Sequence, residues 1–377
     1  MGSLCRILQI LSFLLLLSGV SCAEASSTSV QSADTIAPVR PEVYRLVFAG
    51  DIMVHGPQIK AARTAEGMYD FTSSFDSLAS RISSADLAFG NLETTFGGKP
   101  YTGYPMFSTP DAMGTALREA GFDVLTTSNN HSADRSALGI TRTLDVLDSL
   151  GIAHTGSYRS VDERKRTVPL MLELGSLRLA VLAYTYGTNG LTVPEPTLVD
   201  GIDTLLMAQD IARADSLGAN YKIVQIHWGV EYERAPNREQ RALARWLHGQ
   251  GVDAIVGSHP HVVQQSEWIE PDSLESRKSF VIYSLGNFVS NQRKPAATRG
   301  GMLLSLTLSR ANPTADIVTQ PSYQYVFVNK LRPDGRAVYR LLPVDLPKAQ
   351  VPVPLPRAEQ VDLQDFCSYY SAIPMVH

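Results

Sequence analysis

The chain has 377 residues, of which 44% are hydrophobic and 19% charged, and its formal net charge is −4 at pH 7. This composition is typical of a globular protein, and the slight excess of acidic residues argues against nucleic acid as a partner. The length suits one large α/β domain with appendages, or two domains.

The first residues predict an export signal that is not part of the fold. Arg6 precedes an apolar, Leu-rich stretch over residues 7–20, which is too short to span a bilayer comfortably. The segment Gly19-Val20-Ser21-Cys22 is similar to a bacterial lipobox, although Gly19 stands where Leu is usual. We therefore predict a signal over residues 1–22, lipidation of Cys22 and a membrane-anchored lipoprotein of the cell envelope. Ordinary cleavage near Cys22 or after Ala25, which would give a soluble periplasmic or secreted protein, is the alternative.

A Ser-, Ala- and Thr-rich stretch over residues 23–41 follows the signal and predicts a flexible tether. Beyond it, short apolar runs alternate with stretches of helical periodicity up to about residue 291. This alternation predicts an α/β fold of two packed mixed sheets flanked by helices. The expected strands are residues 43–49, 86–90, 122–127, 168–174, 177–184, 221–226, 252–256 and 280–284, and the expected helices are residues 75–83, 112–120, 138–150, 203–217 and 238–248.

The pattern changes after about residue 300. Three runs, residues 302–308, 323–328 and 337–342, are expected to form antiparallel strands, and the Pro-rich residues 350–357 are expected to be extended. We predict one domain over residues 42–310, followed by a small β-rich C-terminal extension with a Pro-rich tail over residues 311–377.

Polar side chains suited to metal binding or acid–base chemistry recur directly after the predicted strands. In an open α/β sheet, the loops at the carboxyl ends of the strands meet in one crevice. Carboxylate, imidazole and amide groups without a thiolate suit Mn, Fe or Zn. Taken singly, each residue also has a structural explanation, such as a helix cap or a hydrogen-bonded core histidine. The candidates are Asp51, Asn91, Glu93, Asn130, His131, His227, His259 and His261.

The last two candidates follow an apolar run over residues 252–256. We expect Gly257 to allow a sharp turn at the end of this strand. We expect Pro260 to hold His259 and His261 in a stiff, extended segment. Two histidines in such a position are either exposed loop residues or a pair of metal ligands.

The motifs that contain these residues resemble those of a known family. Any single motif is weak evidence, but five in the same order are strong evidence. They are Phe48-Ala49-Gly50-Asp51-Ile52-Met53, Gly90-Asn91-Leu92-Glu93, Asn129-Asn130-His131-Ser132-Ala133-Asp134, His227-Trp228-Gly229-Val230-Glu231-Tyr232 and Ser284-Leu285-Gly286-Asn287-Phe288. Together with Gly257-Ser258-His259-Pro260-His261, they resemble the calcineurin-like metallophosphoesterases and, more closely, the CapA family of bacterial capsule and poly-γ-glutamate synthesis proteins. The resemblance covers about residues 43–291 and implies a calcineurin-like sandwich.

The resemblance also implies a role for each motif residue, with one or two divalent ions (Mn, Fe or Zn) as the cofactor. Asp51 and His261 would bind a first ion, and Glu93 would bridge both ions where phosphoesterases use Asp. Asn130, His227 and His259 would bind the second ion. His131 would be the general acid, oriented by Asp134 as a carboxylate partner does. Asn91, Glu231 and Asn287 are candidate substrate-binding residues, although Asn287 has the alternative role of fixing its own turn.

One position departs from the phosphoesterase pattern. That pattern places Asp-x-His after the first strand, whereas here Met53 stands at the third position, with His55 two residues further on. The first metal site therefore lacks an expected ligand, which puts a fully assembled dinuclear site in doubt.

The resemblance implies an exported protein of capsule or cell-envelope polymer synthesis. As an enzyme, it would be a metal-dependent hydrolase or transferase acting on an anionic polymer or its phosphorylated precursor. Its other expected partners are the membrane, through the N-terminal lipid, and a polymer synthesis or export complex. Two alternatives remain: an accessory with a degenerate metal site that binds and guides the polymer, and a phosphodiesterase with an unrelated substrate. A basic groove for a polyanion could draw on Arg135, Arg293, Lys294 and Arg299.

Overall fold

The computed structural model describes residues 41–271, 277–332, 335–346, 348–371 and 373–376. The predicted signal over residues 1–22, the lipidation site Cys22 and all but the last residue of the predicted tether lie outside the described residues.

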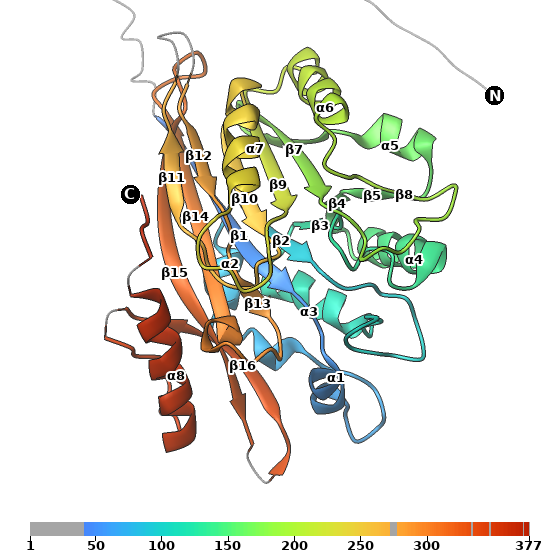
Figure 1. Cartoon of the computed structure of the whole chain (residues 1–377), viewed down its shortest axis with the longest axis vertical. Coiled ribbons are helices and arrows are strands. Elements are labelled where there is room, and N and C mark those ends of the chain that lie inside the picture. The colour runs from blue at the N-terminus through green and yellow to red at the C-terminus, as the bar shows by residue number, and fades with distance from the viewer. Residues whose placement is uncertain (1–40, 272–276, 333–334, 347, 372, 377) are drawn as a thin grey trace, which may run out of the picture. The chain divides into compact units, whose positions relative to one another are not determined.

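The described residues form helices and strands that alternate through most of the chain (Figure 1). The helices are α1 (Gly56–Ala62), α2 (Ala79–Ser83), α3 (Ala112–Ala120), α4 (Ser136–Ser149), α5 (Val161–Thr167), α6 (Thr204–Ser216), α7 (Arg238–Gly249) and α8 (Arg357–Tyr370), with 3₁₀ turns at Thr72–Ser74 and Ala296–Arg299. The strands are β1 (Glu42–Ile52), β2 (Leu87–Leu92), β3 (Val124–Thr126), β4 (Ala153–Thr155), β5 (Ser157–Tyr158), β6 (Leu170–Leu174), β7 (Leu177–Thr185), β8 (Leu198–Val199), β9 (Tyr221–His227), β10 (Ala254–Ser258), β11 (Ser266–Ile269), β12 (Ser279–Ile282), β13 (Asn287–Val289), β14 (Gly300–Arg310), β15 (Val318–Leu331) and β16 (Val338–Val344).

Two mixed sheets carry the fold, as predicted. The first has the strand order β16-β15-β14-β1-β2-β3-β4, and β13 also pairs with β1. The second has the order β11-β12-β10-β9-β7-β6. Strands β1 to β4 run parallel, as do β7, β9, β10 and β12, whereas β6, β11, β14, β15 and β16 pair antiparallel to their neighbours.

The alternation of side chains along β1 shows how the layers are held together. Leu46 and Phe48 share one buried cluster with side chains from β7, β9 and β10, so this cluster fills the space between the two sheets. Val47 and Ala49 point the opposite way and share a second cluster with α2 and α3. A third cluster joins the other face of the second sheet to α6 and α7 (Figure 1). Each fully buried Leu or Phe contributes roughly 1.5–3 kcal/mol, so burial on both faces of the central strands holds the layers together.

Most predicted elements are found close to their expected bounds. Helices α3, α4, α6 and α7 and the hairpin of β6 and β7 agree within two residues at each end. The helix expected over residues 75–83 is only the five-residue α2. The stretch expected as a C-terminal extension adds β15 and β16 to the first sheet, and α8 packs on it through Phe366, whose ring lies 5.6 Å from that of Phe327.

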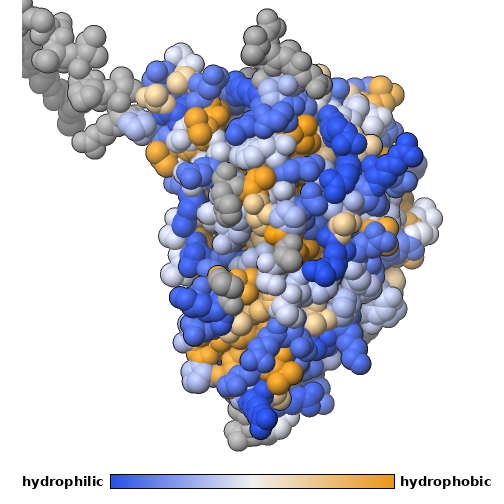
Figure 2. Space-filling view, turned by 60° about the vertical axis from the view of Figure 1, so that its left-hand side comes forward, coloured by the Kyte–Doolittle hydropathy of each residue, from blue (hydrophilic) through white to orange (hydrophobic). Residues whose placement is uncertain are grey.

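The surface over β15 and α8 is mixed in character. Figure 2 shows hydrophilic side chains over most of this face, with apolar side chains interspersed and gathered most densely toward its lower end. In the part of the chain that the structure describes, no helix combines the length and the apolar character that a membrane span requires.

Candidate metal centre

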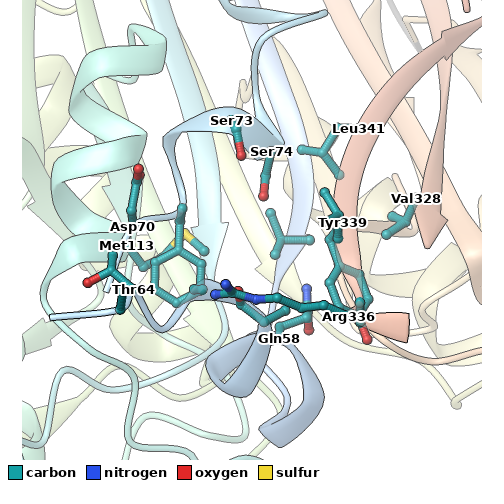
Figure 3. A pocket seen from close by; sticks show the side chains of 17 residues that line it. Gln58, Thr64, Asp70, Ser73, Ser74, Met113, Val328, Arg336, Tyr339 and Leu341 are labelled. Atoms are coloured by element: carbon teal, nitrogen blue, oxygen red, sulfur yellow. The ribbon is translucent and has the colours of Figure 1, made fainter. Parts of the chain in front are cut away.

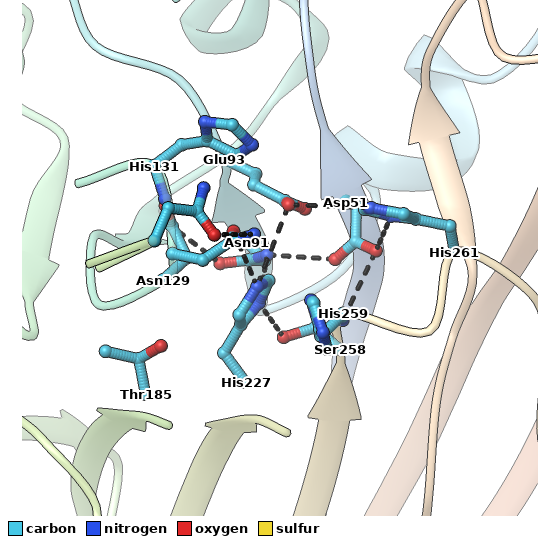
Figure 4. A network of polar contacts seen from close by, with 12 residues as sticks. Asp51, Asn91, Glu93, Asn129, His131, Thr185, His227, Ser258, His259 and His261 are labelled. Carbon is cyan, nitrogen blue, oxygen red and sulfur yellow. Dashed lines mark hydrogen bonds and ion pairs between the residues drawn. The ribbon is translucent and has the colours of Figure 1, made fainter. Parts of the chain in front are cut away.

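The carboxyl ends of parallel strands from both sheets meet at one cluster of buried polar side chains (Figure 4). Asp51 and Asn91 belong to the ends of β1 and β2, and Glu93 follows β2 directly. His227 is the last residue of β9, and His259 follows β10. The two sheets thus supply opposite halves of the same cluster, which is where α/β proteins place their ligands.

The end of β1 is bent so that Asp51 enters this cluster. The pairing of β1 with β2 shifts register between Ala49 and Asp51, and the amide of Asp51 donates a hydrogen bond of 2.9 Å to the carbonyl of Gly286. A Cβ on Gly50 would meet that same carbonyl oxygen at 1.9 Å. Glycine at position 50 is therefore required by the close approach of β1 to the segment that precedes β13.

The two histidines after β10 do not lie in an extended segment, so that prediction is wrong. His259 has φ +96° and His261 has φ +59°, both in the left-handed region that non-glycine residues rarely adopt. Gly257 was expected to form a turn at the end of the strand, but it lies within β10. Its lack of a side chain instead allows close packing, because a Cβ there would meet the carbonyl oxygen of Tyr283 at 2.0 Å. Backbone strain of this kind persists where surrounding contacts enforce it, and it gathers at functional sites.

Glu93 lies at the centre of the cluster. Its side chain is 0% exposed, and neither carboxylate oxygen has a hydrogen-bond partner among the described residues. Its Oε1 atom lies 3.7 Å from Nε2 of both His227 and His261. Burial, reinforced by the neighbouring Asp51 carboxylate, raises the pKa of Glu93 well above its usual 4.5. A buried carboxylate without a partner is costly, so its place in the structure calls for a positive ligand.

Imidazoles from the end of β9 and from the loop after β10 lie on one side of Glu93. Glu93, His227 and His259 offer three ligand atoms that lie within 4.8 Å of one another. Oδ1 of Asn130 lies 3.0 Å from His227 Nε2, on the same side. Burial lowers the pKa of His227 well below 6.5 and that of His259 to about 3, so both rings are neutral and keep a lone pair for a metal ion.

A second group lies on the other side of Glu93. Asp51, Glu93 and His261 again offer ligand atoms within 4.8 Å of one another. His261 Nδ1 lies 2.9 Å from Asp51 Oδ2, and Asn91 Nδ2 donates to Asp51 Oδ1 over 2.9 Å. The two groups share Glu93, which is the arrangement that a bridging carboxylate between two ions requires.

These residues fit one or two divalent cations. The donor set consists of carboxylate, imidazole and amide groups, and the unpartnered oxygens of Glu93 lie between the two groups of ligands. Nδ1 of buried His259 also has no partner in the described part of the chain. Neutral imidazoles and carboxylates are ordinary protein ligands of divalent metal ions.

His131 and Asp134 form a buried pair next to the ligands. His131 Nδ1 lies 2.8 Å from Asp134 Oδ2, and the same oxygen accepts a 2.6 Å hydrogen bond from the amide of Phe107. The Phe107 ring packs edge-on against His131 with its centroid 4.6 Å away. Because Nδ1 is bound to the carboxylate, Nε2 is the ring nitrogen that remains for proton transfer.

A cavity of about 300 Å³ adjoins the cluster. Its described lining contains neither Lys nor Arg, and Met53 lies in its wall where the phosphoesterase pattern would place a histidine. His55 reaches this cavity, but its Nδ1 accepts a hydrogen bond of 3.3 Å from the amide of Asn291. The lining residues are Met53, His55, Tyr104, Phe107, His131, Glu231, Tyr232, His261 and Gln292.

Among the other residues predicted to bind substrate or to form a basic groove, Glu231 lines the cavity, and Asn91, Asn287, Arg135, Arg293 and Arg299 do not. Asn91 lies among the ligands and bonds to Asp51. Asn287 is buried, and its Nδ2 donates to Gln292 and to the Thr298 carbonyl, contacts that fix its own loop. Arg293 and Arg299 form ion pairs with Asp362 in α8, and Arg135 donates to the carbonyl of Pro100, so these three are engaged outside the cavity.

Two further residues, Ser258 and Asn129, orient the cluster, and no role for them was predicted from the sequence. Ser258 Oγ lies 3.0 Å from Nδ1 of His227 and thereby directs Nε2 of that ring toward Glu93. Asn129 donates to the carbonyl of Leu92 and accepts from the amide of His131. Both stand inside quoted motifs, directly beside a candidate ligand, and this adjacency is the signal that could have identified them.

Another cavity, of about 440 Å³, lies away from this cluster, between α1 and β16 (Figure 3). The side chain of Arg336 extends across it toward Gln58 and donates to the carbonyls of Ala61 and Arg63. None of the predicted site residues is among the described residues that line this cavity.

The fold and the cluster define an α/β protein with a candidate centre for divalent metal ions at the meeting edge of two mixed sheets. The chain belongs to the family of bacterial capsule synthesis proteins PGA_cap, whose model matches residues 45–292.

Two curated relatives carry related names. The chain is 28% identical over 281 residues to the capsule biosynthesis protein CapA of Bacillus anthracis, a match that covers 71% of this chain and 65% of that protein. It is 31% identical over 179 residues to the PGA biosynthesis protein CapA of Bacillus subtilis (strain 168), covering 47% and 44% respectively. The chain therefore spans less than two thirds of the length of either relative.

Two solved structures are similar at low identity. The protein TT1561 of Thermus thermophilus shares 10% identity with a TM-score of 0.38, covering 74% of this chain and 99% of that chain. The 5'-nucleotidase of Candida albicans SC5314 shares 13% identity with a TM-score of 0.38, covering 76% and 52%. These likenesses are too distant to carry an inference about function.

Proposed function

We propose that this protein is a metal-dependent hydrolase or transferase of capsule or cell-envelope polymer synthesis, acting on an anionic polymer or its phosphorylated precursor. Membership of the capsule synthesis family supports the biological setting. The observation that carries the enzymatic part is Glu93, a fully buried carboxylate that lies between two imidazoles and has no hydrogen-bond partner among the described residues.

In this proposal the ligands divide into two sets that share Glu93. Asp51 and His261 would hold a first divalent ion with Glu93, and His227, His259 and Asn130 would hold a second. Each ion would be Mn, Fe or Zn. Such ions supply Lewis acidity and a water nucleophile at neutral pH.

The chain's own part in the chemistry is proton transfer by His131. Asp134 accepts a hydrogen bond from Nδ1–H and fixes the orientation of the ring, while the amide of Phe107 fixes the carboxylate. Protonated His131 then donates a proton from Nε2 to the leaving-group oxygen. General acid catalysis of this kind contributes about 10²–10⁴-fold in rate.

The described lining of the cavity contains neither Lys nor Arg, so the negative charge of a bound substrate would be balanced by the metal ions. Tyr104, which is 73% exposed, stands at its rim and offers an aromatic face to a polymer chain. We also propose, from the N-terminal sequence, that the protein is exported and held at the membrane through a lipid on Cys22.

The test is metal analysis of the purified full-length chain, together with turnover of a nitrophenyl phosphodiester and shortening of poly-γ-glutamate. We expect between one and two ions per chain, and loss of an ion together with loss of turnover in His259→Ala. Fewer than about one ion per chain, with unchanged capsule production in cells carrying His259→Ala, would instead favour the polymer-guiding accessory. Rapid turnover of the generic diester with no effect on the polymer would favour a phosphodiesterase of unrelated substrate.

A further inference from the structure

The ligand group of Asp51, Glu93 and His261 lacks a fourth ligand side chain on the side that faces the cavity. In this first group, the position where a further histidine is expected holds Met53. A thioether is a soft ligand that suits Cu(I) rather than Mn, Fe or Zn. His55 does not replace it, because its Nδ1 accepts from the Asn291 amide and the described residues place it in no group of ligand atoms.

A carboxylate from another loop approaches from the cavity side. A carboxylate oxygen of Glu231 and one ring nitrogen from each of His259 and His261 lie within 4.8 Å of one another. Glu231 therefore shares His261 with the first group and His259 with the second. His259 is only 4% exposed, and its Nδ1 atom has no hydrogen-bond partner among the residues that the structure describes. This buried nitrogen, close to Glu231, is therefore free to bind a ligand.

The loop that carries Glu231 is bound directly to the histidine loop. The amide of Tyr232 donates a 2.8 Å hydrogen bond to the carbonyl of Pro260, the residue between the two histidines. The fully buried Gln264 donates over 2.9 Å to the carbonyl of Glu233. Tyr232 has φ +68°, so a strained residue follows Glu231 just as strained histidines flank Pro260. These backbone contacts hold the loop that carries Glu231 against the histidine loop.

We infer that Glu231 is a metal ligand, which completes the site of the ion held by His261 and takes the place of the histidine that Met53 removes. The inference rests on the proposed metal centre and assigns it a ligand from outside the metallophosphoesterase pattern. Glu231 would then join His261 to the carboxylates of Asp51 and Glu93, while His259 also lies within reach of the Glu231 carboxylate. Each carboxylate added to a site favours a hard cation such as Mn²⁺, which is therefore the probe for the role of Glu231.

The experiment measures metal binding, so no substrate is needed. The full-length chain is stripped with a chelator and titrated with Mn²⁺ by calorimetry. We expect Glu231→Gln to weaken one site at least tenfold or to remove it, while circular dichroism shows an unchanged fold. Glu233→Gln is the matched control, because this exposed carboxylate lies two residues further along the same loop and belongs to no ligand group among the described residues. We expect its Mn²⁺ binding to equal that of the wild type.

A second variant tests the exchange of ligands. Adding Met53→His to Glu231→Gln places an imidazole where the phosphoesterase pattern has one, and we expect it to restore the lost site. A folded double variant without the restored site overturns the claim that Glu231 replaces this histidine.

The outcomes separate this inference from the proposed function. A wild-type chain that binds no Mn²⁺, Fe²⁺ or Zn²⁺ overturns the metal centre itself. Wild-type Mn²⁺ affinity in Glu231→Gln, beside a measurable wild-type site, overturns the role of Glu231 and leaves the proposed centre standing. An equal loss in Glu233→Gln also overturns it, because the effect is then one of general charge.

Discussion

Replacing Glu93 by Gln should stabilise the protein when it is free of metal and destabilise it relative to the wild type when metal is present. In the metal-free chain, Glu93 is 0% exposed, has no hydrogen-bond partner among the described residues and lies beside the Asp51 carboxylate. These surroundings disfavour its ionised form and raise its pKa above 4.5. The amide has nearly the same shape and no charge, so the substitution removes the electrostatic penalty without opening a cavity.

The magnitude follows from proton linkage. The unfolded chain ionises Glu93 above pH 4.5, whereas the folded metal-free chain keeps the proton, so stability falls as pH rises toward the folded pKa. Each pH unit in that interval costs about 1.4 kcal/mol. The buried amide brings its own cost of about 1–3 kcal/mol because it has no partner either. At neutral pH we therefore expect the metal-free Glu93→Gln variant to be more stable than the wild type, by a margin that grows as pH rises through that interval.

Thermal or urea unfolding with and without added Mn²⁺ measures both halves of the prediction. Saturating metal at about 100 times its Kd stabilises the wild type by about 2.7 kcal/mol, and the variant should gain much less. The order of stability should therefore reverse when metal is added. If Glu93→Gln instead destabilises the chelated protein at neutral pH, the carboxylate is held by favourable contacts, and the reasoning from its unpartnered burial is wrong.

Four further outcomes are expected. His131→Ala should lower turnover about 10²–10⁴-fold while leaving metal content unchanged, because the ring serves proton transfer. In the chelated protein, stability should fall on acidification from pH 6.5 toward about 3 by up to about 1.4 kcal/mol per pH unit, because burial lowers the pKa of His259 to about 3 and only the unfolded chain takes up its proton. Gly257→Ala should cost roughly 1–3 kcal/mol or more in unfolding free energy, since its Cβ would meet the Tyr283 carbonyl at 2.0 Å. Cys22→Ser should release the protein from the membrane fraction.

Each of these has a control or a contrary result. Metal loss in His131→Ala would make this histidine a ligand rather than an acid. A His259→Gln variant should show a shallower acid dependence, and an unchanged slope would contradict the assignment. Gly249→Ala is the control for Gly257, because a Cβ there meets nothing within 4 Å. A Cys22→Ser protein that stays in the membrane fraction would exclude lipidation as the anchor.

Local sequence pattern predicted the elements whose signals are local. Helix α3 has apolar residues at helical spacing and ends at Gly121, which has φ +102°. Central strands such as β10 are apolar because both faces are covered, so they appear as unbroken apolar runs. The candidate site residues could be predicted in the same way, because they directly follow predicted strands. The end of a parallel strand can be recognised in the sequence, and it lies at a fixed edge of the sheet.

Contacts between distant segments decided the features that local pattern missed. The positive φ values of His259 and His261 accompany a hydrogen bond from the Tyr232 amide to the carbonyl of Pro260 and a contact of His261 with Asp51, which lies 210 positions away in the chain. The insertion of β13 beside β1 explains why Gly50 must lack a side chain, and it too depends on a segment far along the chain, at Asn287–Val289. Periodicity within a short window carries no information about such approaches.

The order of residues was thus sufficient to predict a layered α/β protein and to identify the strand ends that carry Asp51, Glu93, His227 and His259. It identified Glu231 only as a candidate substrate-binding residue. Glu231 lies on an exposed loop and approaches the histidines because hydrogen bonds to Pro260 and from Gln264 hold that loop against them. A strand end has a position set by its own sheet, whereas the position of a loop carboxylate is set by the partners it meets in the folded chain. Which side chains surround the candidate metal centre, with Met53 at the position where a histidine is expected, is therefore decided by the folded structure.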